Sequence, residues 1–295
     1  MADRPAVRPD VAVGEALKAI ARDTLAEARR ALEDRQKPDA IAVHDYRKAM
    51  KRWRSLLRLL QPFLGEDGRR LRTEARDFAR ELSGARDAQS AIEALEDLLE
   101  AEAALSPRTI ASIRGRLDEI RLSAEATLTQ AVRARLIVGL ENAAATIDSW
   151  PLDQLTFAEL ARELTRTYAR LRKEAPKDWR AAEPEVLHEL RSRAVVHRYQ
   201  MELVVPLWPK LGRVWVSEAQ RLRDRLGAFQ DLSVLQGFTI PHAPLALWRS
   251  RLTPLIRARQ ATHAKAAQRI AGRLLAERPK AFRRRIEALW EQGRR

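Results

Sequence analysis

The chain has no cysteine among its 295 residues, which excludes disulfides, cysteine-ligated zinc and thiol catalysis. It has no apolar run near the roughly 20 residues needed to cross a bilayer. Its first ten residues carry two prolines and several charges, unlike a signal peptide. From these absences we expect a soluble cytoplasmic protein with no membrane partner.

Glycine and proline are few, at 11 and 14 residues, and they fall between stretches rich in Ala, Leu, Arg and Glu, which favour helices. Alternating apolar runs bounded by hairpin turns, the usual sign of strands, are missing. We therefore predict an all-α protein. Helix start and stop signals place helices at about 11–35, 39–61, 67–84, 87–104, 107–147, 156–174, 184–205 and 211–228, with later ones punctuated by Pro254 and Pro279.

Acidic residues are outnumbered: 40 Asp and Glu face 55 Lys and Arg, for a net charge of +15. An excess of this size favours a polyanionic partner, which can be nucleic acid, polyphosphate or an acidic membrane surface. The alternative is that the chain comes from a GC-rich genome, in which frequent Arg and Ala are partly background composition.

The stretch from Val43 to Arg58 carries two rows of residues at helical spacing. Apolar residues recur at steps of three and four, as on a buried helix face. These are Val43, Tyr46, Met50, Trp53, Leu57 and Leu60. A basic row follows nearly the same steps one position later, at His44, Arg47, Lys51, Arg54 and Arg58.

One residue corresponds to about 100° of helix rotation, so this basic row lies beside the buried face and not opposite it. Cations in that position lose part of their hydration, which is unfavourable unless an anion joins them. We expect this helix to form one wall of an anion site. Lys48 is rotated further from the buried face, so a solvated position is favoured for it, with the rim of the site within reach.

The two halves of the chain resemble each other when 144 is added to each position of the first. The coincidences include His, Pro and Gly, and they need no gap. They pair His44 with His188, Arg47 with Arg191, Arg54 with Arg198, Pro62 with Pro206, Gly68 with Gly212 and Asp87 with Asp231. We predict one domain over residues 8–295, made of two helical halves at 8–149 and 153–295 that pack about a pseudo-twofold axis.

These motifs resemble the CHAD family, the conserved-histidine α-helical domains that bind inorganic polyphosphate. The resemblance is carried by His44-x-x-Arg47 with Lys51-Arg52-Trp53-Arg54, by His188-x-x-Arg191 with Arg198-Tyr199, and by the later elements Leu82…Asp87 and Leu226…Asp231. It implies two four-helix bundles related by a pseudo-twofold, with a basic groove or channel between them. It also implies polyphosphate binding, location on polyphosphate granules and no catalysis.

The second half departs from the family pattern. Val195 and Val196 stand where the pattern has two basic residues, and Gln220 stands where lysine is common. We therefore expect the first half to dominate affinity.

Cations of the basic row and others placed to face it are predicted to bind the polymer. Arginine offers planar forks to phosphate oxygens and lysine a point charge. No catalytic residue, metal ion or cofactor is predicted, and phosphate or sulfate can occupy the same positions. The predicted binding residues are His44, Arg47, Lys48, Lys51, Arg54, Arg58, Arg72, Arg76, Arg86, His188, Arg191, Arg198 and Arg221.

Two groups have more than one interpretation. Arg72 and Arg76 belong to a row that can form the facing wall, but acidic residues lie among them, so a salt-bridged surface is an equal alternative. Asp87 and Asp231 are expected to cap helices, and the alternative is that they orient an Arg or His side chain.

Two other classes of function compete with polyphosphate binding. RNA or DNA binding fits the charge, but aromatic residues make up only 5% and no stacking platform, zinc pattern or basic zipper is present. An enzyme that acts through phosphohistidine or processes polyphosphate fits less well, because the acids are dispersed and do not converge on a Mg²⁺ site.

Overall fold

The fold is given by a computed structural model that describes residues 4–82, 86–101, 104–124 and 128–294, without the side chains of 79–81 and 124. These residues form α-helices and short 3₁₀ turns and contain no strand, which confirms the all-α prediction. The helices are α1 (Val13–Glu33), α2 (Asp39–Glu81), α3 (Arg86–Glu100), α4 (Pro107–Ala124), α5 (Gln130–Ala145), α6 (Phe157–Glu174), α7 (Pro184–Glu202), α8 (Pro209–Gly237), α9 (Arg249–Leu274) and α10 (Pro279–Gly293).

Several helix boundaries differ from the sequence prediction. The helix expected at 211–228 continues as α8 to Gly237. The helices expected at 39–61 and 67–84 are both parts of α2, which bends at Gly65 (φ 55°, ψ −125°) and not at Pro62. Glycine adopts this left-handed conformation without a Cβ clash. The single helix expected over 107–147 is instead α4 and α5, because Thr129 takes an extended conformation and its side chain accepts a hydrogen bond from the Val132 amide.

Local signals for α6 are confirmed. Thr156 and Glu159 form the capping box: the Glu159 amide donates to the Thr156 hydroxyl at 3.3 Å, and the Thr156 amide donates to the Glu159 carboxylate at 2.9 Å. Leu160, Leu164 and Tyr168 then recur on one face of α6 and are buried. The opposite face is left for charged residues.

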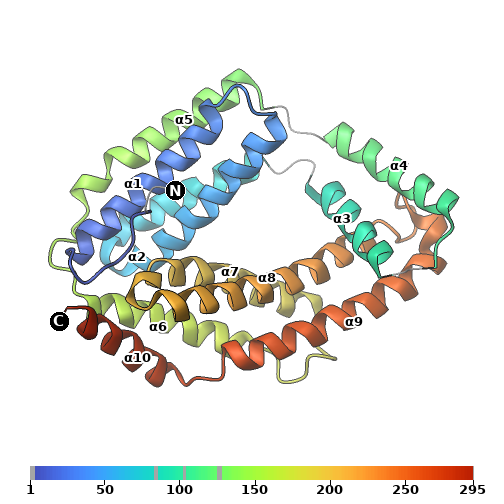
Figure 1. Ribbon diagram of the computed structural model, residues 1–295. Helices are drawn as coiled ribbons and strands as arrows, with labels where there is room; N and C mark the ends of the chain where they lie inside the picture. Colours follow the sequence, from blue (N-terminus) through green and yellow to red (C-terminus); the bar gives the residue numbers. More distant parts are fainter. Residues whose placement is uncertain (1–3, 83–85, 102–103, 125–127, 295) are drawn as a thin grey trace.

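The buried apolar side chains form two cores, and neither core corresponds to one half of the chain. The larger core takes residues from α1, α2 and α5 and also from α6, α7 and α10. The smaller one joins Leu95 of α3 and Ile113 of α4 to Leu232 of α8 and Leu252 of α9. Figure 1 shows α3 and α4 set apart from α1, α2 and α5, with α3 lying against α8 and α4 packing on α3.

The start of each half agrees with the repeat. Helix α1 begins at Val13 and α6 begins at Phe157, which is 144 positions later (157 − 13). The bend of α2 at Gly65 and the start of α8 at Pro209 have the same separation (209 − 65). With this offset, α3 corresponds to the end of α8 and α4 to α9, so these repeat partners share the smaller core.

Ser83, Gly84 and Ala85 of the first Leu…Asp element lie outside the described residues. Within the described part of the chain, no helix is long and apolar enough to span a membrane.

An ion-pair cluster joins the two halves across the smaller core. Asp97 of α3 accepts two hydrogen bonds from Arg259 of α9, at 2.9 and 2.6 Å, and lies 2.8 Å from Nε2 of the buried His263. Burial of Asp97 opposes its ionisation, but the hydrogen bonds from Arg259 and His263 outweigh this effect and lower its pKa.

We predict that Asp97→Ala lowers the free energy of unfolding by about 2 kcal/mol, because Arg259 and His263 then lose their shared acceptor. The measurement is chemical denaturation near neutral pH, where Asp97 is ionised. The control is Asp118→Ala, which removes a partly exposed pair with Arg121 on α4 and should change stability by less than about 0.5 kcal/mol. Equal effects of the two substitutions would contradict a structural role for Asp97.

Candidate anion-binding site

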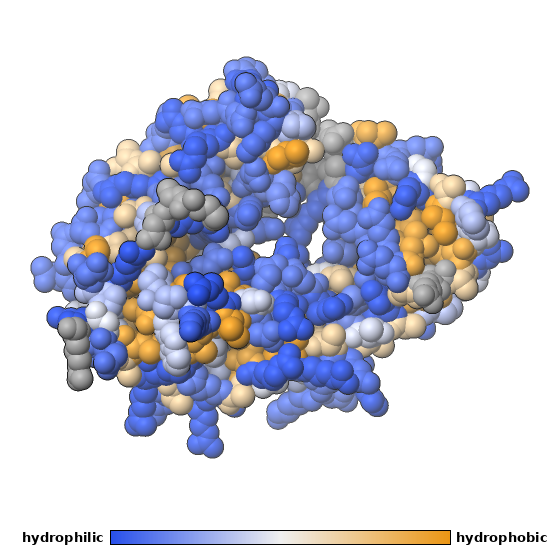
Figure 2. Space-filling view, in the orientation of Figure 1, coloured by the Kyte–Doolittle hydropathy of each residue, from blue (hydrophilic) through white to orange (hydrophobic). Residues whose placement is uncertain are grey.

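A cleft of about 890 Å³ lies between α2, α6 and α7, with Arg86 of α3 and Arg223 of α8 at its border. Figure 2 shows an opening in this region, bordered largely by hydrophilic side chains. Its described lining holds eleven Lys and Arg side chains but only two carboxylates, from Glu163 and Glu189. We call it the basic cleft, and its cations are Lys51, Arg54, Arg58, Arg69, Arg72, Arg86, Arg166, Arg170, Arg191, Arg193 and Arg223.

Helix α2 positions one wall of the basic cleft as its sequence pattern predicts. Met50, Trp53 and Leu57 are buried in the larger core. The adjacent row places Lys51 and Arg58 in the cleft with both side chains half-buried. The cations therefore lie between the core and the solvent.

The bend at Gly65 returns the second part of α2 toward the first. As a result Arg72 donates a hydrogen bond to Gln61, and both residues line the basic cleft. Arg72 also lies close enough to Arg58 to lower its pKa, an effect second only to burial. The predicted facing wall is thus formed at Arg72. Arg76, one turn later, is exposed and pairs with Asp77 at 3.4 Å.

Crowded like charges shift the titration of the basic cleft. Burial, followed by repulsion from Arg223, Arg47, Arg86 and Arg191, lowers the pKa of Lys51 to about 8. Burial also lowers the pKa of Arg191, with Arg223 and Arg86 adding to the shift. These shifts mean that burial and the neighbouring cations oppose the charged state of these groups, and that a bound anion would favour it.

Arg191 lies where three helices meet. Its Nε atom is buried and has no hydrogen-bond partner among the described residues. Helix α8 approaches it at Gly227, where a Cβ atom would lie 3.5 Å from that Nε. This is an ordinary van der Waals separation, so α8 covers one side of the guanidinium without crowding it.

The expectation that Asp231 caps a helix is wrong, because Asp231 lies well inside α8. Burial raises its pKa, while a hydrogen bond with Ser90 of α3 and the charge of Arg191 oppose the rise. The alternative role, an acid that orients an arginine, fits this position. Asp87 lies in the first turn of α3, where a carboxylate interacts favourably with the helix dipole.

Seven of the thirteen predicted residues line the basic cleft. They are Lys51, Arg54, Arg58, Arg72, Arg86, His188 and Arg191. Arg47 lies next to them, because it donates to the Leu82 carbonyl oxygen at 3.3 Å and its pKa is lowered by burial and by Arg86. His44 continues the row and is exposed.

Four predicted residues lie outside the basic cleft. Lys48 and Arg76 are exposed on α2. Arg221 is exposed on α8 and pairs with Glu218 at 2.5 Å. Arg198 pairs with Glu202 at 2.8 Å, and its guanidinium lies 4.6 Å from the centre of the Tyr199 ring. The exposure of Lys48 agrees with the solvated position favoured for it. Arg76, Arg198 and Arg221 instead pair with acids outside the cleft.

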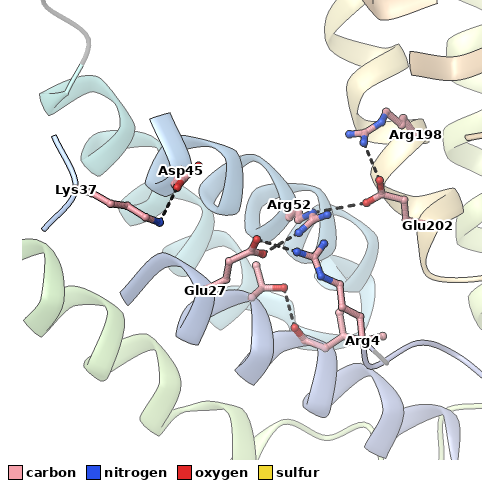
Figure 3. Close-up of polar contacts among 9 residues, drawn as sticks. Arg4, Glu27, Lys37, Asp45, Arg52, Arg198 and Glu202 are labelled. Atoms are coloured by element: carbon pink, nitrogen blue, oxygen red, sulfur yellow. Dashed lines mark hydrogen bonds and ion pairs between the residues drawn. The ribbon is translucent and has the colours of Figure 1, made fainter. Parts of the chain in front are cut away.

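Figure 3 shows the network of ion pairs to which Arg198 belongs. Glu27 of α1 pairs with Arg52 at 2.7 Å, Arg52 lies 3.6 Å from Glu202, and Glu202 pairs with Arg198. The repeat aligns Glu202 with Arg58 (58 + 144), so an acid replaces a cleft cation in the second half. Val195, aligned with Lys51, lines the cleft without charge. The α7 wall is therefore less basic than the α2 wall.

Sequence reasoning missed several cleft residues. Arg166 and Arg170 extend from α6, Arg193 from α7 and Arg223 from α8. Arg166 and Arg170 are four residues apart on the side of α6 opposite its buried face, and this spacing places them on one surface of the helix. The same pattern also fits an ordinary solvated surface, so it does not by itself indicate a site. No group of three or more His, Asp or Glu side chains in the described part of the chain is arranged to hold a metal ion.

Solved structures with a similar fold include the following two. PptA from Streptomyces chartreusis has a TM-score of 0.64 and 19% sequence identity, covering 90% of this chain and 99% of that one. The CHAD domain from the plant Ricinus communis has a TM-score of 0.58 and 21% identity, covering 98% of this chain and 95% of that one. At these identities the likeness concerns the fold alone. No curated protein matches the chain in sequence.

A comparison with family models agrees with the motifs and the helical architecture. The model of the CHAD domain matches residues 15–239. This span includes both histidine motifs and all the residues that line the basic cleft. The chain therefore belongs to the CHAD domain family.

Proposed function

We propose that the basic cleft binds inorganic polyphosphate and does not change it chemically. The observation that carries the proposal is the excess of half-buried cations over acids in the cleft lining. Burial, and after it repulsion from the neighbouring cations, lowers the pKa values of Lys51, Arg58 and Arg191. A linear polyanion would relieve that repulsion along the whole wall.

The spacing of the α2 row suits a flexible chain of phosphates. Successive cations are about one helical turn, or about 5.4 Å, apart. Such a row can contact repeating phosphates without reading a sequence. Location in the cytoplasm, on polyphosphate granules, follows as part of the same proposal.

The absence of catalysis is also part of the proposal. Both carboxylates of the described cleft lining are paired with arginines, Glu163 with Arg166 at 2.6 Å and Glu189 with Arg193 at 2.7 Å. Neither is placed to hold a catalytic metal with other acids. Incubation with polyphosphate and Mg²⁺ should release no phosphate, and release would contradict this part.

RNA binding is the competing proposal. Tyr199 is the one aromatic residue in the described lining of the basic cleft, and it is buried, so it offers no open platform for base stacking. Polyphosphate should therefore displace RNA at a far lower phosphate concentration than the reverse. The opposite order of displacement would favour RNA.

We predict that Arg58→Ala/Arg191→Ala weakens polyphosphate binding about 100-fold, because two charge-assisted contacts are lost. Calorimetric titration at fixed ionic strength measures the affinity, and circular dichroism checks the fold. The matched control is Lys48→Ala/Arg221→Ala, which removes the same charge outside the cleft and should change affinity by less than about threefold. Similar losses in both variants would show a general charge effect instead of a site.

We also predict that affinity falls as the pH rises above about 8, the pKa of Lys51. Because a bound anion raises this pKa, binding takes up a proton in that range. The expected decrease is up to about tenfold per pH unit. Lys51→Arg keeps its charge throughout and should flatten the profile. If the affinity of the wild type does not change between about pH 8 and about pH 9.5, Lys51 does not belong to the site.

A further inference from the structure

A second groove lies on the other flank of α6 from the basic cleft. It has a volume of about 600 Å³ and is formed by the end of α6, the loop that follows it and the end of α9. Its described lining contains Arg172, Lys173 and Lys177 but no acid, and the buried Trp179 forms part of its wall. We call it the outer groove.

A row of cations connects the two places. Arg166, Arg170 and Lys173 follow each other at steps of four and three on α6, on the face opposite the buried Leu164. Arg166 and Arg170 line the basic cleft, whereas Lys173 lines the outer groove. Seven residues of helix span about 10.5 Å. We call Arg166, Arg170, Lys173 and Lys177 the α6 row; Lys177 lies just beyond the helix end at Glu174.

The acids near the α6 row are already engaged. Glu163 pairs with Arg166 at 2.6 Å, and Glu174 lies 4.0 Å from Arg193. The carboxylate of Asp178 accepts hydrogen bonds from the backbone amides of Arg180 and Ala181, at 2.9 and 3.3 Å. These acids therefore do not fill the outer groove, and its lining stays cationic.

Arg172 has a different role from the lysines. Its Nε donates to the Leu275 carbonyl oxygen at 2.9 Å, which ties α6 to the end of α9 and shapes the outer groove. Lys173 and Lys177 are exposed, so their ammonium groups are available to an anion that leaves the basic cleft over α6.

We infer that the α6 row guides a long polyphosphate chain from the basic cleft to the outer groove, so that long chains are held at two linked places. This inference rests on the proposed function of the basic cleft. A chain already bound in the cleft presents its next phosphates to the groove at a high effective concentration. Short chains, which cannot extend past Arg170, are held by the cleft alone.

The test compares tripolyphosphate with long-chain polyphosphate in calorimetric titrations of the full chain. Lys173→Ala/Lys177→Ala should bind the long polymer about tenfold more weakly and tripolyphosphate as tightly as the wild type does. The slope of log affinity against log salt for the long polymer should fall by about 1.4, or about 0.7 per lost contact. Thermal unfolding verifies that the variant is folded.

The matched control is Arg114→Ala/Arg116→Ala, which removes two exposed cations from α4 and should bind both ligands like the wild type. Unchanged binding of the long polymer by the Lys173/Lys177 variant would overturn the inference. So would an equal loss for both ligands, or a similar loss in the control. Failure of the wild type to bind either ligand would instead overturn the proposed function.

Discussion

Repulsion among half-buried cations is the constraint on which the basic cleft depends. Lys51, Arg86, Arg191 and Arg223 come from four different helices and still lower one another's pKa values or that of a neighbour. Only apolar packing beneath them can hold such an arrangement together. The fully buried Tyr46 and Trp53 of α2 provide part of this packing, and the Trp53 ring stacks on Trp150 at 5.9 Å. An anion in the cleft would reduce the repulsion and leave the packing unchanged.

The two halves of the chain contribute unequally to this arrangement. Helix α2 presents an unbroken basic row, whereas α7 places Val195 and Glu202 at corresponding positions. Glu202 instead takes part in the network of Glu27, Arg52 and Arg198, which links α1, α2 and α7. Arg52 of the first half makes the links between these helices, whereas Arg198 of the second half pairs with Glu202 within α7. The missing charge on the α7 wall is replaced by arginines from α6 and α8.

The smaller core has a direct consequence for the cleft. Helices α8 and α9 extend into both cores, and Asp97 fastens α3 to α9. Arg86 stands at the start of α3 and lines the cleft. The packing of α3 on α8 therefore decides whether Arg86 approaches Arg191. The charge density of the cleft depends on contacts between parts of the chain that are far apart in sequence.

Most of the helices and the basic row of α2 can be predicted from the sequence, because helical periodicity and capping depend on residues only three or four positions apart. The repeat is also visible in the sequence, as matching residue types 144 positions apart. The capping box at Thr156 is one example, and the half-buried positions of Lys51 and Arg58 are another. Which cations line the same cleft depends on the tertiary structure. The bend at Gly65 brings Arg72 to Arg58, and Glu202 engages Arg198. The packing of α6 beside α7 adds Arg166 and Arg170 to the cleft. The reason is physical: the direction in which a helix face points is set by its own sequence, but what it faces is set by the packing of distant apolar residues.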